Sequence, residues 1–388
     1  MALHAVHLVR RRSTQLALVF GLAIALIGSA LAFTNSSTVN AAALSTTGIG
    51  SGGASYCYGQ LIVPQTNADT ATIINQSTDL ITQTIGVGAF PMAATYSGDG
   101  RLSFVGNDGG QSVDVIDTTN NSITRTLQVN QRVFDVRSNV DGSVLWIYGY
   151  VGGNFSLAKI DAATGSTLAS YVLLNNALDL VLSPNESILW VLEDAYPDTR
   201  ILELDASTLT LVSSTQISIY SYQAAIDPSG LTLYMPDTNG SGVAAFDTQS
   251  LTTTTFGPAI TYYGAALSPS GTTLYTVGSS GTYEMYSFDL SNNTWTVGSD
   301  LSSIAQITYL TNGMAITADG SKVYVSNMNY SSGGLFVVET ADISAASFLP
   351  TEIYARAATC PLAVDPATPV TTTTEPSSSD PVTPSFTG

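Results

Sequence analysis

One pattern of apolar and polar positions recurs along most of the chain. It begins with a short apolar stretch followed by a turn that contains Gly or Pro, and we call this stretch strand a. Copies of strand a with its turn lie at 91–100, 133–142, 177–186, 222–230, 263–271 and 313–320, and a seventh apolar copy lies at 361–366. Short apolar runs bounded by Gly, Pro, Asn and Asp are typical of β-strands joined by tight turns.

Two further elements accompany each copy of strand a. Strand b is a β-rich run such as VLWIYGY from 144, and its other copies begin at 61, 102, 188, 232, 273 and 322. Trp146 and Trp190 occupy matching places in strand b, so we expect both to pack in the core. Strand c ends in an apolar residue, an Asp and a polar turn, with degenerate copies near 73 and 337. The Asp residues are spaced by 44, 44, 42 and 42 positions and are Asp117, Asp161, Asp205, Asp247 and Asp289.

This repeat predicts an all-β fold, a seven-bladed β-propeller of four-stranded antiparallel blades spanning 59–366. One four-stranded sheet cannot bury both of its faces, whereas sheets stacked in a ring bury each face against a neighbour. The first strand b begins at Leu61 before any strand a, and the last strand a is 361–366. We therefore expect the ring to be closed by pairing of the N-terminal strands with this C-terminal strand.

Three segments resemble the repeats of the YVTN β-propeller proteins of bacterial and archaeal surfaces. They are TIGVGAFPMAATYSGDG (84–100), SVDVIDTTNNSI (112–123) and KVYVSN (322–327). The resemblance covers about 59–366 and implies an exported, cell-surface or surface-layer protein. It implies little chemistry, because the motif consists of turn and core residues. Some relatives with similar propellers are lactonases or dehydrogenase subunits, but none of their catalytic residues matches a position in this sequence.

Both ends of the chain differ from the repeat. Residues 1–15 are basic without an acid, and 16–33 form an uncharged, mostly apolar run. This predicts a signal peptide over 1–32, with an uncleaved membrane anchor as the alternative. Residues 33–58 are a linker, and 367–388, rich in Thr, Pro and Ser, are predicted to form a disordered tail or stalk. These segments predict an extracellular, secreted or cell-surface protein.

The chain has two cysteines, Cys57 and Cys360. An even number in an exported chain predicts a disulfide, and this one would join the two ends of the ring. Alignment with the blade that contains Tyr222 places the two residues near opposite ends of strand a. The segment before Leu61 would have to fold back to bring them together.

The charged residues exclude several kinds of function. The chain has 29 acidic and 11 basic residues, with a formal net charge of −18. Its two histidines, His4 and His7, lie in the predicted signal peptide, so the mature chain would lack histidine-based triads, acid–base catalysis and zinc ligands. Clustered Lys and Arg that would bind phosphates are lacking, which argues against nucleic acid as a partner.

The repeated Asp residues are best explained as turn residues that accept a hydrogen bond from the backbone two positions on. Two loops, Asn107–Gln111 and Asp237–Ser241, have the oxygen spacing of a calcium site, but each lacks the distant bidentate acid that completes one. We therefore assign no metal and no cofactor, with Ca²⁺ as a weak alternative.

The aromatic residues are distributed unevenly between the two expected faces. In a propeller the d-to-a and b-to-c connections lie on one face, which we call the Tyr-rich face, and the a-to-b and c-to-d turns lie on the other, which we call the turn face. Tyr and Arg supply contact area and polar groups for binding. Strand-start tyrosines such as Tyr222 and Tyr263 could instead plug the central channel. The candidate ligand-binding residues are Tyr150, Phe155, Tyr196, Arg200, Tyr220, Tyr222, Tyr262, Tyr263, Tyr283, Tyr330, Arg132 and Arg356.

These features predict a secreted or cell-surface propeller that acts as a binding or surface-structural module. Its partner would be a protein, peptide or glycan on the Tyr-rich face, and it would meet a membrane only through an uncleaved N-terminal segment. The alternative is a lactonase-like or other hydrolase that depends on carboxylates and a metal, with Asp135, Arg137 and Asp179 near the channel. Each of these three also fits a polar residue that faces a water-filled channel.

Overall fold

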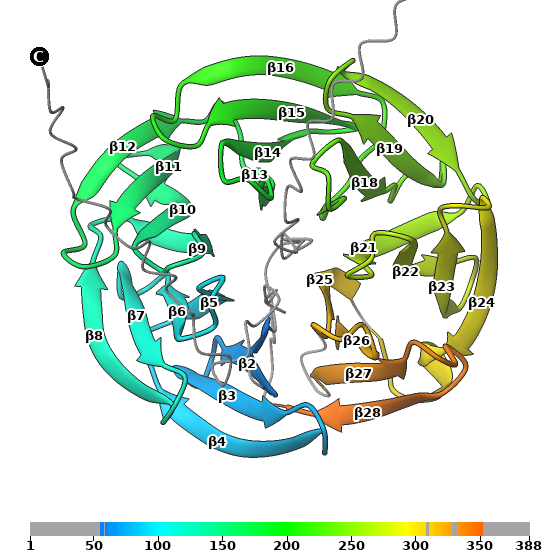
Figure 1. The fold of residues 1–388 in the computed structure, drawn as a ribbon, viewed down its shortest axis with the longest axis horizontal. Coiled ribbons are helices and arrows are strands. Elements are labelled where there is room, and N and C mark those ends of the chain that lie inside the picture. Colours follow the sequence, from blue (N-terminus) through cyan, green and yellow to red (C-terminus); the bar gives the residue numbers. More distant parts are fainter. Residues whose placement is uncertain (1–54, 58, 308–309, 328–332, 352–388) are drawn as a thin grey trace, which may run out of the picture. The chain divides into compact units, whose positions relative to one another are not determined.

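The computed structural model describes residues 55–57, 59–307, 310–327 and 333–351. All of them belong to one compact unit, 43–388. Their strands form seven four-stranded sheets, and within each sheet the strands follow one another in chain order. The sheets stand around a common axis as the blades of a ring (Figure 1). The predicted architecture of seven antiparallel blades is confirmed.

The blades have the following strands. Blades 1 and 2 contain β1 (Ser55–Cys57), β2 (Gln60–Gln65), β3 (Thr70–Asn75), β4 (Leu80–Gly86), β5 (Pro91–Tyr96), β6 (Leu102–Asn107), β7 (Ser112–Asp117) and β8 (Ser122–Gln128). Blades 3 and 4 contain β9 (Arg132–Ser138), β10 (Val144–Val151), β11 (Asn154–Asp161), β12 (Thr167–Val172), β13 (Ala177–Leu182), β14 (Ile188–Ala195), β15 (Asp198–Asp205) and β16 (Leu211–Ile217). Blades 5 and 6 contain β17 (Ala225–Ile226), β18 (Thr232–Pro236), β19 (Val243–Asp247), β20 (Thr252–Phe256), β21 (Thr261–Leu267), β22 (Thr273–Ser279), β23 (Tyr283–Asp289) and β24 (Thr294–Asp300), followed by the 3-10 turn η1 (Leu301–Ser303). Blade 7 contains β25 (Leu310–Ile316), β26 (Lys322–Asn327), β27 (Gly334–Glu339) and β28 (Ala346–Pro350).

The Asp repeat marks the same point of five blades. In each of these blades the Asp at the end of strand c lies opposite the first residue of strand b, as with Asp117 and Leu102 or Asp289 and Thr273. Its Oδ1 accepts the backbone N–H two residues on at 2.8–3.0 Å. Hydrogen bonds from the Ser207 hydroxyl and from Thr208 lower the pKa of Asp205 to about 2. The turn interpretation of these residues is confirmed.

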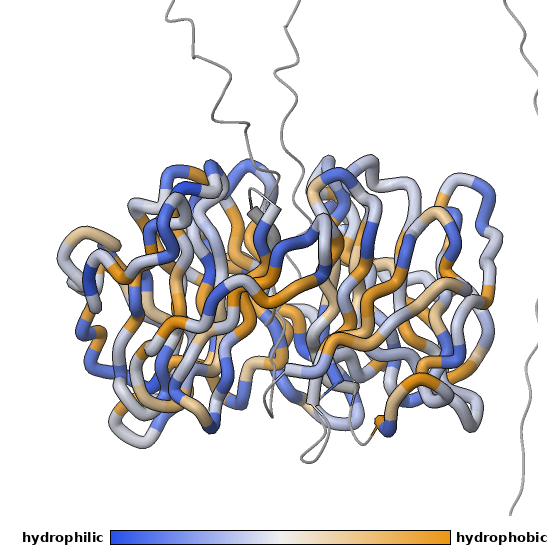
Figure 2. Tube along the Cα trace, turned by 90° about the horizontal axis from the view of Figure 1, so that it is seen from below, coloured by the Kyte–Doolittle hydropathy of each residue, from blue (hydrophilic) through white to orange (hydrophobic). Residues whose placement is uncertain are grey.

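The core lies between neighbouring blades. Strand b is buried on both sides, as in β14, where Leu189 to Glu193 are all buried. In the outer strand β12, by contrast, every residue is exposed or half-buried. Trp146 and Trp190 are 4% and 3% exposed, and Trp146 Nε1 donates to the Ala206 carbonyl of the next blade at 2.8 Å. The prediction that both pack in the core is confirmed. Figure 2 shows many hydrophilic residues at the turns on both faces of the ring.

The first blade differs from the prediction in its innermost strand. Beside β2 lies β1, with Ser55 opposite Ile62 and Cys57 opposite Gln60, so all four strands come from the N-terminal part of the chain. A strand joined to its partner by a tight turn needs less loop-closure entropy than one some 300 positions away. The predicted closing strand 361–366 lies outside the described residues, as do Cys360 and hence the predicted disulfide, the segments 1–54 and the tail 367–388.

Side chains join blade 1 to blade 7. Leu61, Val63 and Ile74 of blade 1 form one apolar cluster with Tyr324, Leu335 and Val337 of blade 7. Asp79 of blade 1 accepts hydrogen bonds from Lys322 Nζ at 2.6 Å and from the Tyr324 hydroxyl at 2.8 Å. Blades 1 and 7 are therefore joined by an apolar cluster and by the hydrogen bonds of Asp79, one of which is an ion pair with Lys322.

Candidate functional site

Five of the predicted tyrosines lie together on the Tyr-rich face of blades 4 to 6. We call them the tyrosine cluster. It consists of Tyr196 in the loop between β14 and β15, Tyr220 and Tyr222 in the connection between β16 and β17, Tyr263 in β21 and Tyr283 at the start of β23. The fold thus places on one face predicted residues that lie up to 87 positions apart in the chain.

Two ring pairs of the tyrosine cluster pack edge to face. The centroids of Tyr196 and Tyr220 are 5.2 Å apart at an interplanar angle of 85°, and those of Tyr220 and Tyr222 are 5.1 Å apart at 81°. The edge-to-face geometry of these two pairs brings the positive edge of one ring to the negative face of the next and adds to the apolar contact. The ring centroids of Tyr263 and Tyr283 lie 5.9 Å apart at a tilted interplanar angle of 57°. The cluster therefore consists of two packed groups, Tyr196–Tyr220–Tyr222 and Tyr263–Tyr283.

Exposure within the cluster is graded. Tyr196 is 74% exposed, Tyr220 is 7% exposed, and Tyr222, Tyr263 and Tyr283 are half-buried. Burial, followed by the neighbouring Tyr222 and Asp194, raises the pKa of Tyr220 well above its usual value, so its hydroxyl stays protonated and can donate a hydrogen bond. An exposed ring that rests on a buried one offers contact area without a large loss of side-chain entropy on binding.

Hydrogen bonds hold the backbone that carries the cluster. Asp194 Oδ1 accepts the backbone N–H of Tyr196 at 3.1 Å, and Asn239 Nδ2 donates to the Pro197 carbonyl at 2.8 Å. The fully buried Asp237 accepts the backbone N–H of Tyr220 through Oδ1 at 2.9 Å and that of Ser241 through Oδ2 at 2.8 Å. Asp237, which the sequence places in a calcium-like loop, is therefore a support of the connection that carries Tyr220.

The predicted arginines of this face are engaged in ion pairs. Arg200 pairs with Glu193, which is fully buried and whose Oε1 accepts the backbone N–H of Asn175 at 2.7 Å. Arg132 pairs with Asp108 through Nε and through Nη2, the latter at 2.6 Å, and its guanidinium lies 5.0 Å from the centroid of the Phe134 ring. We conclude that Arg200 serves mainly to compensate a buried charge.

The other predicted residues are distributed differently. Tyr150 and Phe155 pack against each other in blade 3 at 5.3 Å and are half-buried. The structure places Tyr262 in the core between blades 5 and 6 instead of on the surface, fully buried against Tyr286 and Phe288. Successive residues of a strand point to opposite faces, so Tyr263 packs on the other side of β21, half-buried against the core cluster shared with blade 7. Tyr330 and Arg356 lie outside the described residues.

The candidate hydrolase residues link neighbouring blades near the axis. Arg137 is 1% exposed, and it donates to Asp135 Oδ1 of its own strand at 2.5 Å, to Asp179 Oδ1 of blade 4 at 3.1 Å and to the Leu180 carbonyl at 2.8 Å. Asp179 Oδ2 accepts the backbone N–H of Ala224 in the connection to blade 5 at 2.8 Å. The two carboxylates thus share one guanidinium. Among the described residues no three His, Cys, Asp or Glu side chains are grouped closely enough to hold a metal ion.

Gln223 continues this network and was not singled out by the sequence. Its Oε1 accepts the backbone N–H of Ala265 in blade 6 and of Met314 in blade 7, and its Nε2 donates to the Met314 carbonyl, each at 3.2 Å. A continuous polar network therefore connects the innermost parts of blades 3 to 7. A lone Gln in a β-rich repeat gives no signal of such contacts, because its partners are backbone groups of other blades.

Comparison with known proteins supports the architecture. No protein-family model matches the chain. It is 28% identical over 123 residues to the seven-bladed beta-propeller protein Rv1057 of Mycobacterium tuberculosis, and the match covers 31% of each chain. The chain is a seven-bladed β-propeller. The match spans less than a third of that relative's length, so it supports the fold and says nothing about an activity.

Solved structures resemble the propeller in fold alone. Kuenenia stuttgartiensis hydrazine synthase superposes with a TM-score of 0.57 at 16% identity, over 73% of this chain and 93% of that one. A functionally unknown protein from Desulfotomaculum acetoxidans superposes with a TM-score of 0.59 at 13% identity, over 76% of this chain and 99% of that one. At 16% and 13% identity, these two similarities show a shared fold alone. In the described part of the propeller no helix is long and apolar enough to cross a membrane.

Proposed function

We propose that this propeller is an exported binding module whose ligand contacts the tyrosine cluster on the Tyr-rich face. The observation that carries the proposal is that the exposed ring of Tyr196 packs on the buried ring of Tyr220. A ring that is 74% exposed and supported by a buried ring has the geometry of an aromatic anchor for a partner. The predicted signal peptide over 1–32 and the predicted tail over 367–388 support a location at the cell surface or in the medium.

The ligand we propose is a peptide or glycan displayed outside the cell. Tyrosine hydroxyls supply donors and acceptors beside an apolar ring, and Asp194 and Asp198 add carboxylates next to Tyr196. Aromatic rings with nearby acceptors suit ligands that carry both apolar faces and N–H or O–H donors. The hydrolase alternative gains no support from the network of Arg137, because its carboxylates are already used in contacts between blades.

The test uses arrays of immobilised glycans and immobilised peptides as probes. On whichever array retains the protein, the Tyr196→Ala variant should bind at least about tenfold more weakly, as expected for an aromatic anchor. Trp295→Ala is the matched control, since Trp295 is a 49% exposed aromatic residue on the outer strand β24. Retention by neither array, or equal retention of wild type and Tyr196→Ala, would contradict the proposal.

A further inference from the structure

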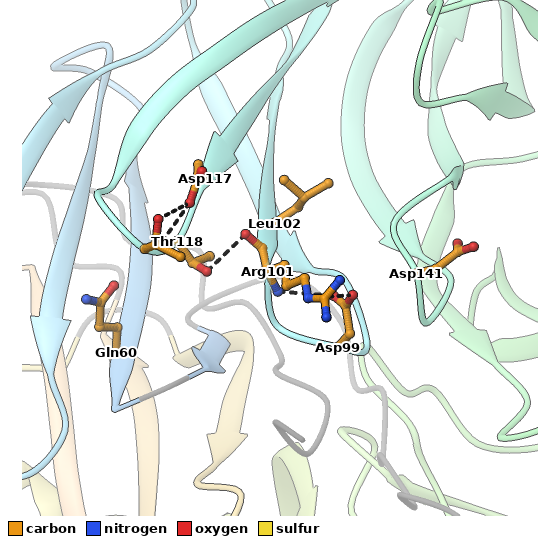
Figure 3. A pocket seen from close by; sticks show the side chains of 8 residues that line it. Gln60, Asp99, Arg101, Leu102, Asp117, Thr118 and Asp141 are labelled. Carbon is orange, nitrogen blue, oxygen red and sulfur yellow. Dashed lines mark hydrogen bonds and ion pairs between the residues drawn. The ribbon is translucent and has the colours of Figure 1, made fainter. Parts of the chain in front are cut away.

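A pocket of about 690 Å³ opens on the turn face of the propeller. It lies among the turns of blades 1 to 3, at the opposite ends of the strands from the tyrosine cluster (Figure 3). Its volume is in the range of sites that bind small organic molecules. The lining residues are Gln60, Asp99, Arg101, Leu102, Asp117, Thr118, Thr119 and Asp141.

Negative charge prevails in the pocket. Three carboxylates from three different turns, Asp99, Asp117 and Asp141, line it together with one guanidinium. The hydroxyl and the backbone N–H of Thr119 lower the pKa of Asp117, and those of Ser143 lower the pKa of Asp141. Both carboxylates therefore remain ionised at neutral and mildly acidic pH.

Hydrogen-bond acceptors also prevail over donors. Gln60 Oε1 is buried and has no hydrogen-bond partner within the described residues. The Thr118 hydroxyl directs its proton to the backbone, at 2.6 Å from the Gly100 carbonyl, which leaves its lone pairs as acceptors. Asp117 uses Oδ1 for both of its described bonds, to the backbone N–H and the hydroxyl of Thr119. A buried acceptor without a donor is costly, so Gln60 Oε1 favours a ligand that supplies an N–H donor, and the partly exposed Asp117 adds a second acceptor.

The carboxylates are too dispersed for a metal ion. In the described part of the chain they form no group that could coordinate one cation. Charges spread over several turns around a large pocket instead match a ligand whose positive charges are themselves separated. We propose that this pocket binds an organic cation with two or more alkylammonium groups, either a free polyamine or the lysine side chains of a peptide.

Arg101 sets the affinity of the pocket. Its side chain is 76% exposed, and its Nε lies 3.7 Å from Asp99 Oδ2, a loose pair at the edge of the lining. A guanidinium in this position repels an incoming ammonium group and competes with it for Asp99. Removing this charge should strengthen the binding of a cation, an effect opposite in sign to the removal of a carboxylate.

The experiment is titration calorimetry of the purified protein with spermidine and, separately, with a short oligolysine peptide. Asp117→Asn should weaken binding and Arg101→Gln should tighten it, each by roughly threefold, as expected for exposed charge pairs. Asn75 occupies the equivalent turn of blade 1, where its Oδ1 accepts the backbone N–H of Thr78 at 3.1 Å, so the turn tolerates Asn. Asp289→Asn, the same change in blade 6, is the matched control and should leave binding unchanged.

The two probes distinguish the source of the ammonium groups. The stated pattern with spermidine supports a polyamine site, and the same pattern with oligolysine alone supports a peptide site. Binding of neither probe, or equal weakening by Asp117→Asn and Asp289→Asn, overturns the proposal, because the latter shows diffuse attraction to an acidic surface. Tyr196→Ala should leave this binding unchanged, so the outcome is independent of the function proposed for the Tyr-rich face.

Discussion

At the scale of single residues, the scarce cations of this chain have two different roles. Arg200 compensates Glu193, which is fully buried, and Arg137 pairs with both Asp135 and Asp179 near the axis. Arg101, in contrast, is largely exposed beside the pocket of the turn face. The sequence indicates that basic residues are rare and that Arg200 lies among tyrosines. It does not reveal that Glu193 is buried while Asp194 lies beside Tyr196, because this depends on which side of β14 each residue faces.

The engagement of Arg200 with a buried acid leads to a prediction about stability. Arg200→Ala should lower the free energy of unfolding by about 3–5 kcal/mol, because the charge of Glu193 would remain buried without a partner. Denaturation by urea, followed by tryptophan fluorescence, measures the change. Arg101→Ala is the control and should change the free energy by less than about 0.5 kcal/mol, since its ion pair is exposed and long. Equal stability of the two variants would show that the buried pair is unimportant.

At the scale of the elements, strands a, b and c could be predicted because each copy repeats the same apolar run and the same turn chemistry. The Asp at the end of strand c keeps one register in five blades, and that regularity makes the repeat visible in the sequence. The full burial of Tyr262 and the partial burial of Tyr263 could not be predicted, because inner strands pack on both faces and show no clear alternation. The innermost strand of blade 1 escaped prediction because Ser55–Cys57 is short and carries no apolar run.

The network between the inner strands gives a prediction at this scale. Gln223→Met keeps the volume of the side chain but leaves the backbone N–H groups of Ala265 and Met314 without their acceptor. The free energy of unfolding should fall by about 2 kcal/mol or more, the usual penalty for unsatisfied buried groups. The same change at the exposed Gln128 should have little effect. If urea denaturation gives the same midpoint for both variants, the polar network does not hold the inner strands together.

At the scale of the whole molecule, the two faces of the ring differ in chemistry. The Tyr-rich face carries two groups of packed tyrosines over blades 4 to 6, and the turn face carries carboxylates that turn hydrogen bonds keep ionised. The Asp turns recur with the blade repeat, whereas Tyr196, Tyr220 and Tyr222 lie in connections whose sequences differ from blade to blade. The scaffold can therefore present two independent binding surfaces.

Hydrogen exchange measured by mass spectrometry, with and without the array-selected ligand, tests the central proposal most directly. Binding at the tyrosine cluster should slow exchange in the loop 194–198 and in the connection 218–224, while the turns near Asp117 and Asp141 keep their rates. Protected backbone amides report the contact surface without any substitution that could alter folding. Slower exchange confined to the turn face, with the loops of Tyr196 and Tyr220 unchanged, would contradict the assignment of function to the Tyr-rich face.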